Sequence, residues 1–123
     1  RTARKVPTVV LSAPEAPAAR LEALRKAGVG VDTGANLAAQ LRALKARGVQ
    51  SILVEGGGVL AGRLIAAGLV DRLYLLQAPM LLGRDGVSAF GELRGVRLDD
   101  AERWRVAGRR VLGADALTVL DRR

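Results

Sequence analysis

The sequence of 123 residues contains no cysteine and no histidine, and its aromatic residues are one Trp, one Tyr and one Phe. The missing side chains exclude disulfide frameworks, catalysis by cysteine or histidine, and zinc or haem sites that use those ligands. We therefore expect no metal site and a core made of Leu, Val, Ile and Ala. Chemistry is left to acidic, basic and hydroxyl side chains, backbone amides or a bound cofactor.

Long hydrophobic runs are also missing. No stretch reaches the roughly 18 apolar residues of a membrane span, and no signal-peptide pattern follows Arg1. We therefore expect a cytoplasmic protein without a membrane partner. Because 50% of the residues are hydrophobic, the chain is long and apolar enough for one compact domain over residues 1–123.

Acidic residues are in the minority, with 12 against 20 basic residues and a net charge of +8. The basic excess lies at the two ends: the first 50 residues hold nine basic and three acidic side chains, whereas the next 50 hold five and six. A basic surface attracts nucleic acid or anionic metabolites. The alternative is a solvated, arginine-rich surface, and the scarcity of aromatic side chains for base stacking favours it. No nucleic-acid partner is expected.

Apolar runs alternate with helical patterns along the chain. Strands are predicted at 8–11, 29–31, 51–54 and 72–77, followed by an antiparallel hairpin of 104–112 and 117–120. Three helices lie between the first four strands: one begins at Pro17, one is capped by Asn36, and all three end at glycines, Gly28, Gly48 and Gly68. The stretch from Phe90 to about Asp100 is expected to be irregular. The order predicts an α/β fold with a mostly parallel sheet flanked by helices, and an antiparallel hairpin at its edge.

The segment Glu55-Gly56-Gly57-Gly58-Val59-Leu60 carries the strongest chemical signal, because an apolar strand runs through three glycines into a helix. Helix N-terminal amides attract anions, and glycines let a phosphate approach the backbone. The segment fits the G-x-G-x-x-A pattern, but the acidic residue expected about 20 positions later is missing. A phosphate-binding turn and a tight turn without a ligand both remain open.

Glu55 follows the predicted strand at its carboxyl end, where open α/β sheets bind ligands. Its carboxylate is placed either to bind a sugar hydroxyl or to accept hydrogen bonds from the following glycine amides. Arg84, in the loop at 82–86, is a second candidate for contact with a phosphate, with a solvated side chain as the alternative. Asp71 is interpreted as a helix-end or turn residue and Trp104 as a core or edge-packing residue. The Arg109-Arg110 pair is interpreted as a solvated turn or edge strand.

Several separated motifs keep a family order: Ile-Leu-Val-Glu-Gly-Gly at 52–57, Leu-Ala at 60–61, Ala-Gly-Leu-Val-Asp at 67–71, Ala-Pro at 78–79 and Leu-Leu-Gly at 81–83. Over about 33 residues the chain thereby resembles the reductase domain of the bifunctional riboflavin-biosynthesis deaminase–reductase, which has the dihydrofolate-reductase-like fold. The resemblance implies that the chain corresponds to the C-terminal portion of that domain. One departure is Met80, where many family members carry Lys.

The resemblance also implies a function. The family reaction is NADPH-dependent reduction of the ribosyl group of 5-amino-6-(5-phosphoribosylamino)uracil to ribityl. By this analogy Gly56, Gly57, Gly58, Val59 and Leu60 border the cofactor pyrophosphate, and Glu55 approaches the substrate sugar or the nicotinamide. A homodimer is expected. The alternative is a catalytically incomplete fragment or dimerisation module related to reductases of other pterin- or pyrimidine-type compounds.

Overall fold

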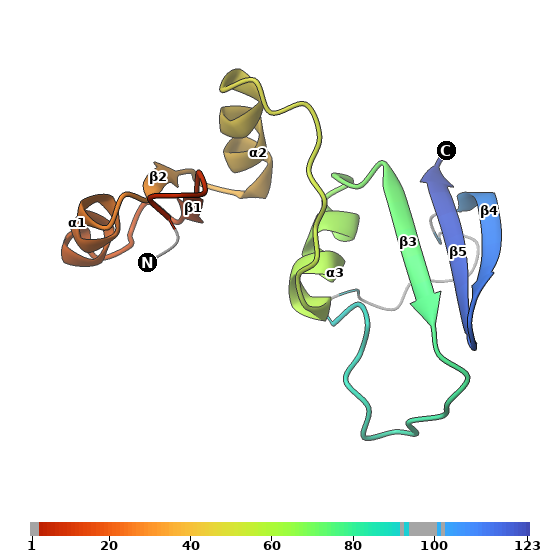
Figure 1. The fold of residues 1–123 in the computed structure, drawn as a ribbon. Helices are drawn as coiled ribbons and strands as arrows, with labels where there is room; N and C mark the ends of the chain where they lie inside the picture. The colour runs from red at the N-terminus through yellow and green to blue at the C-terminus, as the bar shows by residue number, and fades with distance from the viewer. Residues whose placement is uncertain (1–2, 92, 94–100, 102) are drawn as a thin grey trace. The chain divides into compact units, whose positions relative to one another are not determined.

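The computed structural model describes residues 3–91, 93, 101 and 103–123. The chain divides into two compact units, Arg1–Leu53 and Val54–Arg123, each of which is treated by itself (Figure 1). The expected irregular stretch from Phe90 to about Asp100 lies largely outside the described residues. In the described part of the chain, no helix has the length and apolar character needed to cross a membrane.

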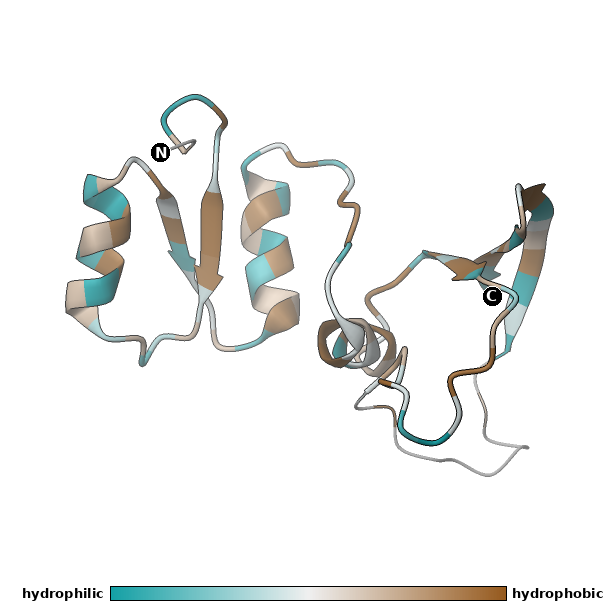
Figure 2. Cartoon of the chain, turned by 60° about the horizontal axis from the view of Figure 1, so that its bottom comes forward, coloured by the Kyte–Doolittle hydropathy of each residue, from teal (hydrophilic) through white to brown (hydrophobic). Residues whose placement is uncertain are grey.

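The first unit is a two-stranded parallel sheet with two helices. It contains β1 (Val9–Ser12), α1 (Ala18–Lys26), β2 (Gly30–Thr33) and α2 (Leu37–Ala46). The parallel register runs from Val9 opposite Gly30 to Ser12 opposite Thr33. Both helices contact β2 and flank the strand pair, and β1 is hydrophobic along most of its length (Figure 2). The two strands and two helices predicted for this region are therefore confirmed.

All three described helices end in the same hydrogen-bonded motif. Each closes with a glycine at positive φ: Gly28 at 84°, Gly48 at 89° and Gly68 at 69°. At the end of α1 the amide of Gly28 donates to the carbonyl of Arg25 (2.9 Å), and Val29 donates to Leu24 (3.0 Å). This pair of bonds is the Schellman arrangement, which needs a left-handed residue and so selects glycine. The predicted helix ends are confirmed for this reason.

Side chains tie α2 to the ends of the parallel strands. Asn36 caps the helix, with its Oδ1 accepting from the Ala39 amide at 2.9 Å. The Gln40 Nε2 donates to the carbonyls of Ser12 (3.0 Å) and Gly34 (3.3 Å). At the other end of α2, the Arg47 Nη2 lies 2.5 Å from the Asp32 Oδ1. The first unit is thus stabilised by polar contacts as well as by its buried Leu21.

The second unit contains α3 (Gly58–Ala66) and an antiparallel sheet of β3 (Arg72–Gln77), β4 (Trp104–Leu112) and β5 (Asp115–Arg122). The strand order is β3-β5-β4. The hairpin of β4 and β5 turns through Gly113, whose φ of 66° suits the first central position of a type II′ turn. The predicted C-terminal hairpin is confirmed, and in the structure its strand β5 pairs antiparallel with β3.

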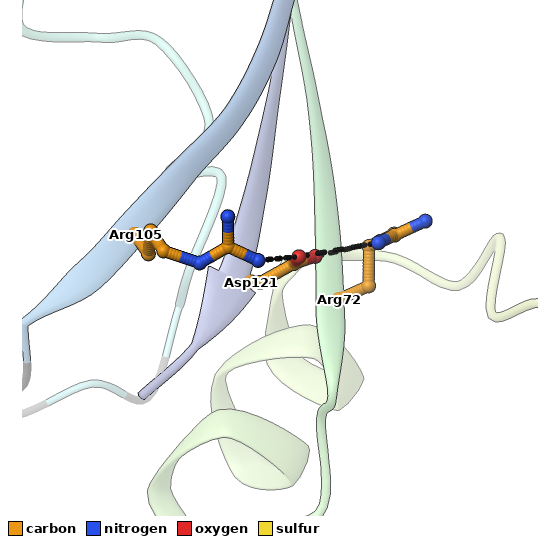
Figure 3. A network of polar contacts seen from close by, with 3 residues as sticks. All are labelled: Arg72, Arg105 and Asp121. Carbon is orange, nitrogen blue, oxygen red and sulfur yellow. Dashed lines mark hydrogen bonds and ion pairs between the residues drawn. The ribbon is translucent and has the colours of Figure 1, made fainter.

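An ion-pair network joins all three strands of this sheet (Figure 3). Asp121 in the central strand accepts from Arg72 of β3 (2.6 and 3.1 Å) and from Arg105 of β4 (2.7 Å). The hydrogen bond from Arg72 lowers the pKa of Asp121 below its usual value, and the charge of Arg105 acts in the same direction. The same bond, with a contribution from Tyr74, raises the pKa of Arg72. Each strand therefore supplies one charge to the network.

The strand predicted at 51–54 is wrong, since the structure has no strand there. Ile52, Leu53 and Val54 are exposed and belong to no helix or strand, and no described strand pairs with them. A strand exists when its backbone N–H and C=O groups pair with a neighbouring strand. Residues 51–54 have high strand propensity but no partner strand among the described residues, so they form no strand.

Candidate functional site

The glycine turn leads directly into α3. Gly57 is the N-cap residue, with an extended backbone (φ −70°, ψ 171°), and Gly58 is the first helical residue. The carbonyl of Gly57 accepts the first helical hydrogen bond, from the amide of Ala61 at 3.1 Å. The helix therefore starts at Gly58, the last of the three candidate phosphate-binding glycines, one residue earlier than the sequence predicts.

The three glycines face different surroundings. A Cβ on Gly58 would lie 2.3 Å from the carbonyl oxygen of Ser88, and a Cβ on Gly56 would lie 2.8 Å from the Leu60 Cδ2. A Cβ on Gly57 would meet no atom within 4 Å. Gly58 is thus required by its packing against the loop backbone, whereas Gly56 faces only the flexible end of the Leu60 side chain. Gly57 leaves open space beside the helix N-terminus.

A loop from the far side of β3 packs against this turn. The amide of Gly91 donates to the carbonyl of Gly58 at 3.0 Å, and the Ser88 Oγ accepts from the amide of Phe90 at 3.3 Å. The carboxyl end of β3 and the start of α3 lie at the same end of this unit, so the loop returns to the helix (Figure 1). Sequence reasoning missed this contact, because nothing in the pattern of Ser88–Gly91 identifies its partner 30 residues earlier.

The first turn of α3 has the electrostatic character of an anion site. It contains no acidic residue, and no side chain caps its N-terminus among the described residues. The first amides of an α-helix have no partner within the helix, and the helix dipole places partial positive charge there. Val59 and Leu60, which follow the glycines, are exposed. The arrangement is therefore suited to accept a phosphate through backbone N–H groups.

The other predicted residues make no contact with this turn among the hydrogen bonds and ion pairs of the described residues. Glu55 is exposed, and the structure gives its carboxylate no hydrogen bond or ion pair with a described residue, the glycine amides included. Arg84 is exposed in the loop after β3, also without a described partner. Asp71 is a turn residue before β3, and its carbonyl accepts from the amide of Arg122 at 3.0 Å. Trp104 begins β4, and Arg109 and Arg110 are exposed on that edge strand, as interpreted from the sequence.

Comparison with known families gives one match over most of the chain. The model described as "RibD C-terminal domain" matches residues 2–117. A 2,5-diamino-6-ribosylamino-4(3H)-pyrimidinone 5′-phosphate reductase from Methanothermobacter thermautotrophicus is 29% identical over 92% of this chain and 54% of its own length. The reductase of the same name from Archaeoglobus fulgidus is 32% identical over 82% of this chain and 48% of its own. The chain spans about half the length of these relatives.

Solved structures share the fold. The RibD of Acinetobacter baumannii superposes with a TM-score of 0.75 at 20% identity, covering 94% of this chain and 37% of that one. A pyrimidine reductase-like protein from Corynebacterium diphtheriae gives a TM-score of 0.77 at 23% identity, over 94% of this chain and 50% of that one. These likenesses confirm the α/β, dihydrofolate-reductase-like fold. The family match over residues 2–117 shows that the chain belongs to the RibD C-terminal domain family.

Proposed function

We propose that this chain carries the cofactor crevice of an NADPH-dependent reductase of riboflavin biosynthesis. The substrate is a phosphorylated ribosylamino-pyrimidine, 5-amino-6-(5-phosphoribosylamino)uracil, whose ribosyl group is reduced to ribityl. Family membership and the reductase names of the Methanothermobacter and Archaeoglobus relatives support this reaction class. Within the structure, the observation that carries the proposal is the uncapped start of α3 with open space at Gly57.

The residues present fit a pyrophosphate group. The amides at the start of α3 supply hydrogen-bond donors, and the missing Cβ at Gly57 leaves room for phosphate oxygens beside them. Gly58 packs closely against the backbone carbonyl of Ser88, which supports a turn whose donors are ordered before a ligand binds. Val59 and Leu60 present exposed side chains next to the same amides.

When bound, NADPH supplies a hydride to the aldehyde-level carbon of the ribosyl group, and the protein mainly holds the two molecules in register. This division of labour suits a chain without histidine or cysteine. Glu55 precedes the glycines and has a carboxylate without a described partner. We assign it to a hydroxyl of the substrate sugar, which a carboxylate orients by accepting a hydrogen bond.

A pair of glycine substitutions tests the cofactor site. Gly57→Val puts a side chain into the space beside α3, so NADPH binding measured by calorimetry should weaken by at least about tenfold, the loss of one charge-assisted contact. Gly108→Val is the matched control, because a Cβ on Gly108 also meets no atom within 4 Å but lies on β4. Equal NADPH affinity in the Gly57 variant and the unaltered chain would contradict the proposal.

The role of Glu55 is tested by Glu55→Gln. Loss of the charge should lower kcat for the pyrimidine substrate and leave the affinity for NADPH unchanged, because Glu55 is assigned to the sugar and not to the pyrophosphate. Steady-state NADPH oxidation gives both quantities. A variant with unchanged kcat and KM removes Glu55 from the site.

A second candidate is that these 123 residues fold without being active alone. Two observations favour it: the chain spans about half of its relatives, and the apolar segment before Glu55 has no described partner strand. NADPH oxidation by this chain should then be absent, while the Methanothermobacter relative, assayed in parallel, turns over. Measurable turnover by this chain decides against the second candidate.

We further propose that the protein is a homodimer through the C-terminal hairpin. β4 is an edge strand, and Val111 and Leu112 on it are exposed, which suits pairing with a second copy. Sedimentation equilibrium should give a dimer for the unaltered chain and a monomer for Val111→Lys. A monomer in both cases contradicts this arrangement.

A further inference from the structure

The face of the second unit's sheet that carries Tyr74 is hollowed into an open groove of about 430 Å³. Its lining includes Arg72 and Tyr74 of β3, Gly108 and Arg110 of β4, and Val119 of β5. Tyr74 pairs with Val119, and Val119 pairs with Gly108. Directly opposed residues of antiparallel strands share one face of a sheet. These three residues therefore form one row across the sheet, and this row is the floor of the groove.

The hollow has a local cause in β4. The register between β4 and β5 shifts between Val106 and Gly108, which marks a bulge at Ala107. Bulges re-aim neighbouring side chains and are frequent beside binding sites. After the bulge comes Gly108, where a Cβ would meet nothing within 4 Å. The floor is thus open on the β4 side because Gly108 carries no side chain and no neighbour fills the space.

The groove is separate from the glycine turn. Asp121 lies on the groove face, since it is opposite Arg72 in the register. Arg122, the next residue, points to the other face, because side chains alternate along a strand. A Cβ on Gly68, just after α3, would lie 2.8 Å from the Arg122 Nη1. The end of α3 therefore lies against the sheet face opposite the groove.

The groove face has more positive than negative charge. Arg72 and Arg105 share the carboxylate of Asp121. Arg110 is two residues beyond Gly108 on the same face, is exposed, and forms no ion pair or hydrogen bond with the residues that the structure describes. Asp121 is thus already saturated by two guanidinium groups, and the Arg110 guanidinium is left available for an anion from solution.

We propose that this groove binds a mononucleotide, with the base against Tyr74 above Gly108 and the phosphate on Arg110. The Tyr74 side chain, 54% exposed, offers a flat ring for a planar base. A guanidinium matches the geometry of a phosphate and binds it through two parallel hydrogen bonds. The volume is in the range of roughly 300–1,000 Å³ typical of small-molecule sites. Gly108 leaves the space for the base, and Arg110, the second residue after it on β4, supplies the positive charge.

The test is a titration of the isotopically labelled chain with uridine 5′-monophosphate and, separately, with inorganic phosphate, followed by NMR amide shifts. Shifts should be centred on Tyr74, Gly108–Arg110 and Val119. Arg110→Gln should weaken mononucleotide binding by about tenfold, the value of one charge-assisted contact. Arg42→Gln is the matched control, because it removes the same charge from an exposed position on α2 without a described partner.

Two more variants separate this groove from the proposed cofactor site. Gly108→Val should abolish mononucleotide binding and leave NADPH binding intact, whereas Gly57→Val should do the reverse. Amide spectra of both variants show whether the sheet is retained, and Gly108→Ala, with a smaller intrusion, should weaken binding less. Tyr74→Leu should reduce affinity for the mononucleotide and not for inorganic phosphate.

Several results would overturn the proposal. One is equal weakening by Arg42→Gln and Arg110→Gln, which indicates a diffuse attraction of the whole basic chain. Another is a set of shifts centred on 57–60, which places the ligand at α3. A third is equal affinity for phosphate and the mononucleotide with no effect of Tyr74→Leu. Self-association that covers Tyr74, seen as concentration-dependent shifts on this face, would overturn it too.

Discussion

Two short apolar stretches of this chain have similar composition and different structures. Residues 51–54 read Ser-Ile-Leu-Val, and residues 117–120 read Leu-Thr-Val-Leu. The second stretch is the middle of β5, paired with β3 on one side and β4 on the other. The first has no described partner strand, and its Leu53 side chain is 74% exposed. β-propensity describes fitness for a sheet, and the available neighbours decide whether the strand forms.

The largest predicted difference between the two stretches is in the hydrogen-exchange rates of their backbone amides. The amides at 52–54 should exchange close to the unprotected rate, because nothing described accepts their hydrogen bonds. The amides at 117–120 should be slower by orders of magnitude, since they open only with the sheet. Exchange measured by NMR on one sample supplies both values under identical conditions. Equal protection of the two stretches would mean that residues 51–54 pair in solution, for example with a second copy.

Gly57 and Gly58 give a second comparison, because these neighbouring glycines differ in how closely other atoms surround them. Gly58→Ala drives a Cβ to within 2.3 Å of the Ser88 carbonyl oxygen, so helix or loop must shift. Overpacking of this kind costs about 1–3 kcal/mol of unfolding free energy. Gly57→Ala meets no atom and has an ordinary φ of −70°, so it should stay within about 0.5 kcal/mol.

Urea unfolding followed by the fluorescence of Trp104 measures both glycine variants. Trp104 begins β4, and the sequence has one Trp, so the signal reports the second unit. If Gly58→Ala is as stable as Gly57→Ala, the loop Ser88–Gly91 does not pack on α3 in solution.

The sequence predicts those features that depend on local chemistry. Asn36 and the glycines at 28, 48 and 68 place helix ends correctly, because caps and Schellman turns involve residues within one turn of each other. The features it misses join distant residues. Arg72 and Asp121 are 49 positions apart, and no periodicity connects them. The contact of Gly58 with Ser88 is of the same kind, so the candidate site was predicted as a glycine turn without its covering loop.

The Asp121 network makes the second unit sensitive to acid. The pKa of Asp121 is lowered in the folded protein, so its contribution to stability is present above the unfolded value of about 3.9. That contribution is lost as the pH falls from there through the folded pKa, because protonation then favours the unfolded chain. Asp121→Asn should lower stability at neutral pH and flatten the loss of stability in acid. The effect should be smaller than that of Gly58→Ala, since solvent screens an exposed network.

Trp104 fluorescence, recorded in urea at several acidic pH values, measures the pH dependence of Asp121→Asn. Asp85→Asn is the control, because Asp85 is exposed in a loop and has no described partner. An acid profile of Asp121→Asn parallel to that of the unaltered chain would show that another carboxylate sets the pH response.

The smallest effect on stability is expected at Asp32 in the first unit. Asp32 pairs with one arginine, whereas Asp121 pairs with two. The Asp32 Oδ1 lies 2.5 Å from Arg47, and its Oδ2 is buried without a partner among the described residues. Arg47→Gln leaves the carboxylate without its cation and should cost about 0.2–1 kcal/mol, the range of partly exposed pairs. Asp32→Asn should cost less, because a neutral amide NH2 replaces the charged, unpaired oxygen at the buried position and the amide oxygen still accepts from Arg47.

The informative result is which of the two variants, Arg47→Gln or Asp32→Asn, loses more stability. The first unit contains none of the three aromatic residues, so far-UV circular dichroism and exchange of the β1–β2 amides replace fluorescence. Lys45→Gln, on α2 and without a described partner, controls for loss of a positive charge. If Asp32→Asn is the more damaging variant, the full carboxylate is needed, and Asp32 has a second partner in solution. Asp32 and Asp121 would then each have two partners, and the two aspartates would differ only in which residues those partners are.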